Sequence, residues 1–313
     1  MRGFRFIPDN TKLPFMRWSR YGFFLSGILC ALSIFAFVTF GLNYGVDFKG
    51  GTLIQIQTQG PADLGSLRQS INSLGLGSNE LQEFGADDAV LIRLEQQPGG
   101  DAAQQEAVAK VKQALGDSVT FQRVEVVGPK VSGELAQQGT IAVVLSILAV
   151  VIYIWLRFEW QFAVGAIASL LHDVILTIGL LTILRLEFNL SIIAAILTIV
   201  GYSLNDTVVV FDRIREFLRK YKSLPIVELI EESINSTLAR TMMTSVTTFV
   251  ALMALYIFGG EVIRGFTFTM LWGVFIGTYS SIFIASPVLI LLGTSRDNGS
   301  EDASPAAAGP IRD

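Results

Sequence analysis

Six long apolar stretches limit the possible folds of this chain more than any other feature of its sequence. A helix needs about 20 mostly apolar residues to cross the roughly 30 Å hydrocarbon core of a bilayer. Because 51% of the residues are hydrophobic and only 16% are charged, against roughly 25% charged in soluble domains, a water-soluble globule is excluded. The predicted membrane spans are 21–40, 140–156, 162–184, 190–211, 241–258 and 266–292.

Basic residues in the short flanking segments predict the orientation, because they stay on the cytoplasmic side. The opposite loops hold only Arg185 and Arg264. We therefore expect both termini in the cytoplasm and residues 41–138 in the periplasm of a bacterial inner membrane. The basic flanks comprise Arg2, Arg5, Lys12, Arg17 and Arg20 before the first span, and Arg213, Arg215, Arg219, Lys220 and Lys222 after the fourth.

The segment 41–138 is predicted to be a folded α+β domain of the ferredoxin-like type. Its strand-like and helix-like patterns alternate in the order β-α-β-β-α-β, which is the split βαβ unit. The expected strands are 52–58, 81–84, 89–95 and 119–127, and the expected helices are 62–74 and 101–115. The two middle strands are expected to be joined through GADD (85–88). Because no catalytic motif stands out here, we expect a binding role for this domain.

The fold class is thus a polytopic α-helical membrane protein with six transmembrane helices and one α+β domain between the first and second. Residues 1–20 form a cytoplasmic tail, 21–40 the first helix, and 139–292 the remaining five. The tail 293–313 is rich in Gly, Pro, Ser and Ala, and this composition predicts disorder.

Cysteine and histidine are scarce, which argues against several kinds of chemistry. With one cysteine, Cys30, and one histidine, His172, neither a disulfide framework nor a typical metal site is expected. We predict no metal, no cofactor, no enzymatic activity and no nucleic-acid partner.

Asp206 is the first candidate functional residue, because ionisable groups within a span are costly and persist where they pair or line a water path. It lies about five residues before the cytoplasmic end of the fourth span, or some 7 to 8 Å deep at about 1.5 Å per residue. Two interpretations stay open: a proton carrier or ion ligand, and a polar contact between helices.

Arg240 stands at the cytoplasmic start of the fifth span and could approach Asp206 at a similar depth. An arginine keeps its proton, so it would hold the carboxylate in place rather than carry the proton itself. The alternative is a side chain that extends to the interface.

His172 and Asp173 lie near the middle of the third span and form a possible second polar site. Adjacent residues on a helix point about 100° apart, so we expect that they do not both face one partner. A transport role and structural hydrogen bonding are both open.

Three motifs resemble the SecD/SecF family of protein-export membrane proteins, which belongs to the resistance-nodulation-division superfamily. They are GVDFKGGT (45–52), VGPKVSGEL (127–135) and GYSLNDTVVVFDRIRE (201–216), and the likeness covers roughly residues 20–295. The six-span layout with one large first loop resembles the SecF members of the family. The matching motif residues include Asp47, Gly50, Gly51, Gly201 and Asn205.

The resemblance implies an accessory subunit of the Sec translocase that uses the proton gradient, with SecD, to promote export. It implies a proton relay through Asp206 and Arg240 together with an aspartate of SecD. The implied partners are SecD, the SecYEG channel, the translocating preprotein and YajC. The proton motive force takes the place of a cofactor.

Three alternatives compete with this interpretation. A stand-alone proton-coupled exporter of small molecules would need twelve spans, which a homodimer could supply. An intramembrane aspartyl protease would use Asp173 and Asp206 as two carboxylates sharing a proton, but the second lies in SLND rather than a GxGD context. A scaffold of the translocon with no proton work is the third.

Overall fold

The computed structural model describes residues 12–293. Most of the predicted N-terminal tail and nearly all of the predicted C-terminal tail lie outside these residues. The basic residues Arg2 and Arg5 of the orientation argument are among them.

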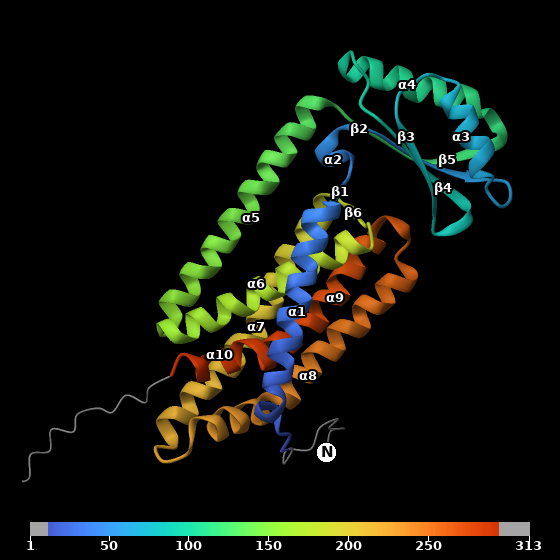
Figure 1. Cartoon of the computed structure of the whole chain (residues 1–313). Coiled ribbons are helices and arrows are strands. Elements are labelled where there is room, and N and C mark those ends of the chain that lie inside the picture. Colours follow the sequence, from blue (N-terminus) through green and yellow to red (C-terminus); the bar gives the residue numbers. More distant parts are fainter. Residues whose placement is uncertain (1–11, 294–313) are drawn as a thin grey trace, which may run out of the picture.

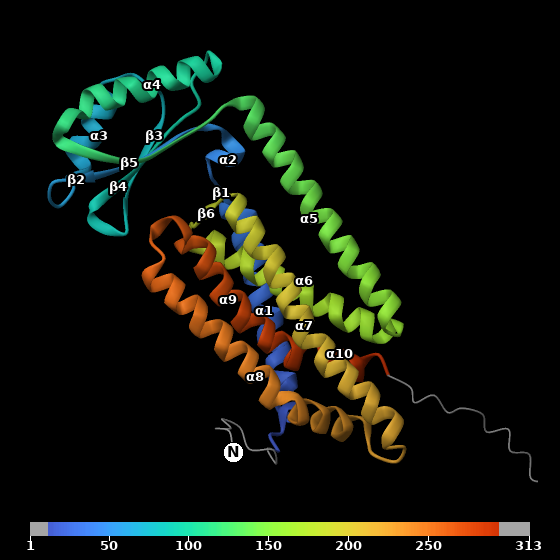
Figure 2. The same ribbon diagram turned by 180° about the vertical axis from the view of Figure 1, so that it is seen from behind.

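Six helical segments are long and apolar enough to cross a membrane, which confirms the predicted class of membrane protein (Figures 1 and 2). The sixth is interrupted, since a π-helical segment joins its two α-helical parts. The segments are α1 (Phe15–Phe40), α5 (Pro129–Arg157), α6 (Trp160–Ile183), α7 (Leu190–Lys220), α8 (Ile226–Phe258), and α9 (Arg264–Ser280) continued by η3 (Ser281–Ala285) and α10 (Ser286–Leu291).

Several helices extend beyond the apolar stretches that predicted them. α5 begins at Pro129 rather than Thr140, and α8 begins at Ile226 rather than Thr241. Hydropathy marks only the part of a helix that suits lipid, whereas the backbone hydrogen bonds continue through polar residues in water. α7 likewise continues through its basic residues to Lys220.

The helices pack closely where small residues allow it. α7 packs against α6, α8 and α9, and α1 packs against α6. A Cβ atom at Gly273 would lie 2.2 Å from Cγ1 of Ile199, so only glycine lets α9 approach α7 at this level. Ala or Gly at such contacts is typical of helix packing in membranes.

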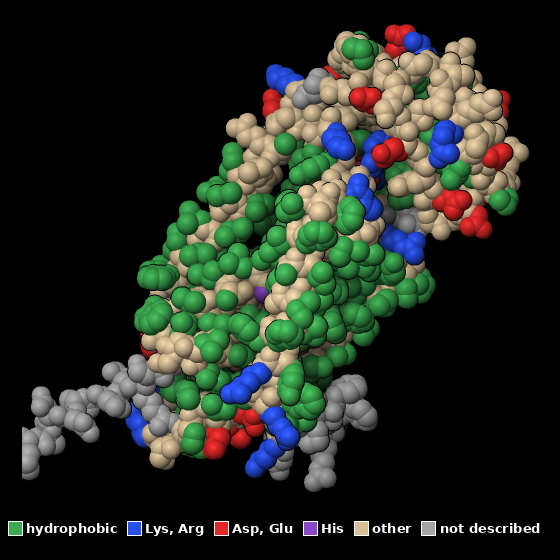
Figure 3. Space-filling model, viewed as in Figure 1, with side chains coloured by type: hydrophobic (Ala, Val, Ile, Leu, Met, Phe, Trp, Pro, Cys, Tyr) green, Lys and Arg blue, Asp and Glu red, His purple; other side chains and the backbone are tan. Residues whose placement is uncertain are grey.

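Apolar side chains cover the visible face of the helical region, and charged side chains gather at its two ends (Figure 3). Many of these apolar side chains are exposed in the isolated chain, for example Phe24, Phe35 and Val38 of α1. An apolar belt of this kind is typical of a membrane protein, because polar side chains that face the hydrocarbon core of the bilayer are costly.

The α+β domain holds a four-stranded antiparallel sheet with the strand order β3-β4-β2-β5. Two helices, α3 and α4, cover one face (Figure 1). Its core joins sheet residues such as Ile54 and Ile92 to Ile71 and Val111 of the helices. Its elements are β2 (Gly51–Thr58), α3 (Leu64–Asn72), β3 (Asn79–Phe84), β4 (Ala86–Leu94), α4 (Gly100–Leu115), η1 (Gly116–Ser118) and β5 (Val119–Val127).

The connection between β3 and β4 is shorter than the sequence suggested. Gly85 alone separates the two strands, with φ +87°, whereas Asp87 and Asp88 belong to β4. Asp88 stays in a strand because its side chain accepts a hydrogen bond from Gln57 Nε2 at 2.8 Å. Asp87 and Asp88 therefore lie in the inner strand β4 rather than in the turn, and that part of the prediction was wrong.

Three short elements between the domain and the membrane helices were not predicted. They are β1 (Asn43–Tyr44), α2 (Val46–Lys49) and β6 (Glu187–Phe188), and β1 pairs with β6 in parallel. Strands of two residues leave no periodic pattern in a sequence. A further 3₁₀ turn, η2 (Glu261–Ile263), precedes α9.

Replacing Gly273 by Ala tests the α7–α9 contact. The added methyl group overlaps Ile199, so we expect a loss of about 1–3 kcal/mol of stability, the usual range for overpacking. Thermal unfolding in detergent measures it. Gly27→Ala is the matched control, because a Cβ there meets nothing within 4 Å; equal melting temperatures for the two variants would contradict this packing.

Candidate functional site

Asp206 lies on the buried side of α7, between the buried residues Ser203 and Thr207. Its side chain is 2% exposed. Within residues 12–293, its Oδ2 atom has no hydrogen-bond partner. A buried carboxylate oxygen without a donor is costly, so Asp206 is a candidate for function rather than for helix packing.

Arg240 lies on α8, close enough to Asp206 to interact with it electrostatically. No ion pair within 4.0 Å joins the two side chains in the described part of the chain. Arg240 is exposed and lines a cavity of about 380 Å³ between α7 and α8, together with Val209, Ser236 and Thr237. The structure thus brings the two predicted residues near each other without a direct contact.

Gly201 and Asn205 lie on the outer surface of α7, one helical turn apart. Both are exposed, and a Cβ at Gly201 would meet nothing within 4 Å. Asn205 directly precedes the buried Asp206, but its own side of α7 is exposed. These two motif residues therefore form an open surface beside the carboxylate.

His172 and Asp173 contact each other inside the bundle. Nδ1 of His172 lies 2.9 Å from Oδ1 of Asp173, and the two residues are 5% and 1% exposed. Both also face α9, because the His172 ring stacks on Tyr279 and Asp173 accepts a hydrogen bond from Ser280. The two side chains therefore contact each other, while their contacts to α9 go to two different residues, Tyr279 and Ser280.

Asp173 is the centre of a polar network that joins three helices. Its Oδ2 atom accepts hydrogen bonds from Ser203 Oγ of α7 at 2.5 Å and from Ser280 Oγ of α9 at 2.8 Å. Ser169 of α6 donates to Ser280 at 2.9 Å. Because Ser203 lies one turn before Asp206 on α7, this network ends close to the unpartnered carboxylate. The sequence singled out Asp173 but carried no signal for the three serines.

The network touches an irregular part of the last membrane segment. η3 (Ser281–Ala285) follows directly after Ser280, and Ser286 donates to the carbonyl of Ser281 at 2.9 Å. π-helical segments are rare and are frequent at functional sites. This widened turn lies just before Pro287 and next to Ser280, the donor to Asp173.

Asp47 of the glycine-rich motif caps the helix that carries Asp206. Its Oδ2 atom accepts a hydrogen bond from the backbone N–H of Leu190 at 2.9 Å, and Asn189 Oδ1 accepts from Ile192 N–H at 3.1 Å. Two of the free N–H groups at the start of α7 are therefore satisfied, and the negative charge suits the positive end of the helix dipole.

Gly50 and Gly51 form the passage from α2 into the sheet. Their φ angles are +71° and +119°, and a Cβ at Gly51 would lie 2.5 Å from the carbonyl oxygen of Leu94. Both the backbone conformation and the close approach favour glycine. The pair sets the direction in which the α+β domain leaves the membrane region.

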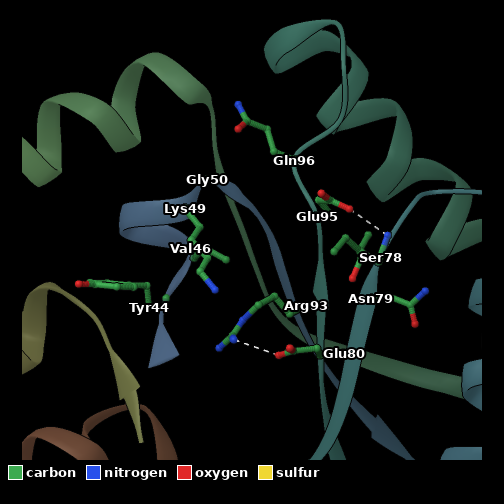
Figure 4. A pocket seen from close by; sticks show the side chains of 12 residues that line it. Tyr44, Val46, Lys49, Gly50, Ser78, Asn79, Glu80, Arg93, Glu95 and Gln96 are labelled. Carbon is green, nitrogen blue, oxygen red and sulfur yellow. Dashed lines mark hydrogen bonds and ion pairs between the residues drawn. The ribbon is translucent and has the colours of Figure 1, made fainter. Parts of the chain in front are cut away.

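A cavity of about 360 Å³ lies beside this passage (Figure 4). Arg93 of β4 points into it and reaches Glu80 at 3.2 Å. The same guanidinium also reaches Glu187 of β6 at 2.7 Å. Arg93 thus links the sheet to the segment that leads into α7. Within residues 12–293, no group of three or more His, Cys, Asp or Glu side chains is placed to hold a metal ion.

Taken together, the fold and these sites define a polytopic membrane protein with buried carboxylates in its helical bundle and an α+β domain anchored at one end. The family model "Protein export membrane protein SecD/SecF, C-terminal" matches residues 107–295, and the model "SecD/SecF GG Motif" matches residues 35–62. The chain belongs to the SecD/SecF family of protein-export membrane proteins.

Curated relatives are similar over nearly the whole chain. The protein translocase subunit SecF of Cereibacter sphaeroides is 42% identical, over 96% of this chain and 95% of the relative. SecF of Magnetococcus marinus is 46% identical, over 94% and 96%. The protein translocase subunit SecDF of Brucella abortus is 43% identical over 96% of this chain, which spans 40% of that longer protein.

Solved structures show the same fold. The crystal structure of SecDF, a translocon-associated membrane protein from Thermus thermophilus, matches 92% of this chain with a TM-score of 0.83 and 33% identity. A second crystal structure, of SecDF in a super-membrane-facing form, matches 91% with a TM-score of 0.67 and 34% identity. The chain spans about 40% of each. It is an accessory subunit for protein export by the Sec translocase.

Replacing Asp173 by Leu tests the buried network. The serine hydroxyls of α7 and α9 would lose their acceptor, and each unsatisfied buried group costs about 1–3 kcal/mol, so we expect a clear fall in the melting temperature in detergent. Asp173→Asn keeps an acceptor oxygen and is expected to lose less. Equal melting temperatures for the Leu and Asn variants would show that the hydrogen bonds to Asp173 contribute little to the bundle.

Proposed function

We propose that the chain couples the proton gradient to protein export, with Asp206 as the group that takes up and releases the proton. The observation that carries this proposal is the buried Oδ2 atom of Asp206, which has no hydrogen-bond partner in the part of the chain described. A proton can be added to this oxygen without breaking an existing hydrogen bond. Asp173, by contrast, uses both of its oxygens.

Arg240 is proposed to sense the charge on Asp206. A guanidinium stays charged, so its attraction to the carboxylate is present when Asp206 is ionised and is lost when Asp206 is protonated. Because no direct ion pair within 4.0 Å fixes the two side chains in residues 12–293, a change in this attraction can shift α8 relative to α7. The cavity between the two helices leaves room for such a shift.

The energy available per proton limits how the subunit can work. One charge crossing 100 mV supplies about 2.3 kcal/mol, which shifts a two-state equilibrium by nearly two orders of magnitude. This amount does not unfold a cargo protein. We therefore propose that repeated small shifts favour outward movement of the preprotein and prevent it from sliding back.

Association with SecD is supported by relatives in which both parts form one chain, as the names SecDF indicate. We propose that SecD covers the surface formed by Gly201, Asn205 and Arg240, and that it supplies a further aspartate to the relay. This surface is open in the chain alone, so a partner can pack there beside the buried Asp206. SecYEG, the preprotein and YajC are the remaining proposed partners.

The proposed location is the bacterial inner membrane, with both termini in the cytoplasm and the α+β domain in the periplasm. The chain is a multi-pass membrane protein. Arg157, Arg213 and Arg215 gather where α5 and α7 end, opposite the α+β domain (Figure 1). Their position supports a cytoplasmic assignment for that end by the positive-inside rule.

The competing functions have less support. The curated relatives are translocase subunits rather than small-molecule exporters. A protease would need Asp173 and Asp206 to share a proton, but Asp173 is bonded to His172, Ser203 and Ser280. A scaffold without proton work is separated from the proposal by experiment.

Replacing Asp206 by Asn tests the proton role. The amide is nearly the same size but takes up no proton, so we expect normal assembly with SecD and loss of the stimulation of export by the proton gradient. Preprotein import into inverted membrane vesicles, with and without a gradient, measures the effect. Asp212→Asn is the control on the same helix, because Asp212 is a half-exposed partner of Arg157. Gradient-stimulated export in the Asp206→Asn vesicles would support the scaffold instead.

A further inference from the structure

The α+β domain is attached to the membrane helices through two glycine-containing passages. The chain enters the sheet through Gly50 and Gly51, both at positive φ, and leaves it through Gly128, directly before Pro129 of α5. Glycine pairs and element ends are where backbone angles change in hinge motions. The covalent connections therefore allow the domain to turn, and non-covalent contacts must set its position.

Arg93 makes such a contact from the face of the sheet opposite α3 and α4. Its neighbours in sequence, Ile92 and Leu94, belong to the domain core, so alternation along β4 places Arg93 on the other face. There it reaches Glu187 of β6 at 2.7 Å, and the two side chains are 16% and 19% exposed. Salt screens the attraction in an ion pair shielded to this degree less than it screens a pair on an open surface.

Glu187 belongs to the membrane side of this contact. β6 pairs with β1, so Glu187 lies opposite Asn43, and Arg185 just before it donates to the carbonyl oxygens of Phe40 and Gly41. Asn189, two residues later, caps α7. A force on Glu187 is thus applied at the start of the helix that carries Asp206, about 24 Å farther along at about 1.5 Å per residue.

Arg93 also has a second acceptor on its own domain. Glu80 of β3 is its cross-strand partner in the sheet and lies 3.2 Å away. If the domain turned away from Glu187, Arg93 would keep Glu80, whose side chain is 72% exposed. Release of Glu187 therefore does not leave the guanidinium without a partner, which lowers the cost of breaking the contact.

We infer that Arg93 and Glu187 form a releasable ionic latch. This ion pair holds the α+β domain against β6, the short strand directly before α7. The inference extends the proposed function, because it names the contact through which the domain and the proton-carrying helix would influence each other. The two solved SecDF structures superpose on this chain with TM-scores of 0.83 and 0.67 over nearly the same share, so they differ in arrangement within the matched region.

Distance measurements between two spin labels test the latch. The labels replace Ser70 on α3 and Val262 in η2, both exposed, in the full chain with Cys30→Ser, in lipid nanodiscs. We expect one narrow distance population without further change. With Arg93→Gln or Glu187→Gln we expect a second population, and a rise of about tenfold in its ratio to the first, which corresponds to about 1.4 kcal/mol.

Two further variants make the test specific. Glu80→Gln removes the charge of the other carboxylate that Arg93 reaches and is the matched control, expected to keep one population. Gly45→Ala keeps every charge but places a methyl group 2.5 Å from Glu187 Oε1, so it should displace Glu187 and produce the second population. Because Gly45 and Glu187 lie outside the four-stranded sheet, these variants answer the question even where Arg93→Gln fails to fold.

One unchanged distance population in both Glu187→Gln and Gly45→Ala would overturn the latch. The distances are measured without a gradient or a preprotein, so that result would leave the role of Asp206 standing. Conversely, gradient-stimulated export in Asp206→Asn would overturn the proton role while a second population in the latch variants still supported the contact.

Discussion

The requirement that buried polar groups find partners inside the protein governs this structure. Hydrocarbon offers no hydrogen bonds, so the polar side chains of the bundle depend on partners in their own helix or in a neighbouring one. The carboxylate of Asp173 meets this requirement fully, through His172, Ser203 and Ser280, and so ties α6, α7 and α9 together. Asp206 does not meet it, within the described residues, at Oδ2. The two carboxylates therefore differ, because Asp173 of α6 accepts a hydrogen bond from Ser203 of α7, whereas Asp206, one turn after Ser203, keeps an oxygen without a partner in residues 12–293.

The same helix, α7, connects the two ends of the molecule. At one end, Asp47 and Asn189 accept hydrogen bonds from its first N–H groups. The strand β6, directly before the helix, pairs with β1 and contacts Arg93 through Glu187. Near its other end lie Asp206 and the cavity lined by Arg240. A helix with intact backbone hydrogen bonds transmits displacement along its axis, so a change in charge at Asp206 and a change in domain position act on one rigid element. The motif around Asp47 and the motif around Asp206 therefore meet on one helix, α7.

Much of the fold could be predicted because membrane spans and amphipathic strands leave periodic, residue-by-residue signals. The six apolar stretches and the β-α-β-β-α-β order are of this kind. The β1–β6 pair was missed because each strand has two residues, and GADD was misassigned because polarity suggests a turn even where Asp88 bonds across strands. At the site, Asp206 and Asp173 were found because charge in a span is conspicuous. The serines Ser203 and Ser280 were missed because serine is ordinary in a membrane helix. Arg93 and Glu187 were missed because a single charge in a strand or a connecting segment is equally ordinary.

The sequence by itself determined the membrane class, the spans and the candidate carboxylates, since these depend on the hydropathy and charge of residues near one another in the chain. Only the tertiary structure decided which carboxylate is satisfied and which polar groups meet. The serines that bind Asp173 are 30 and 107 positions away, and the cap on Leu190 comes from 143 positions away. Contacts over such separations depend on how helices cross, and no local pattern of residues encodes that geometry.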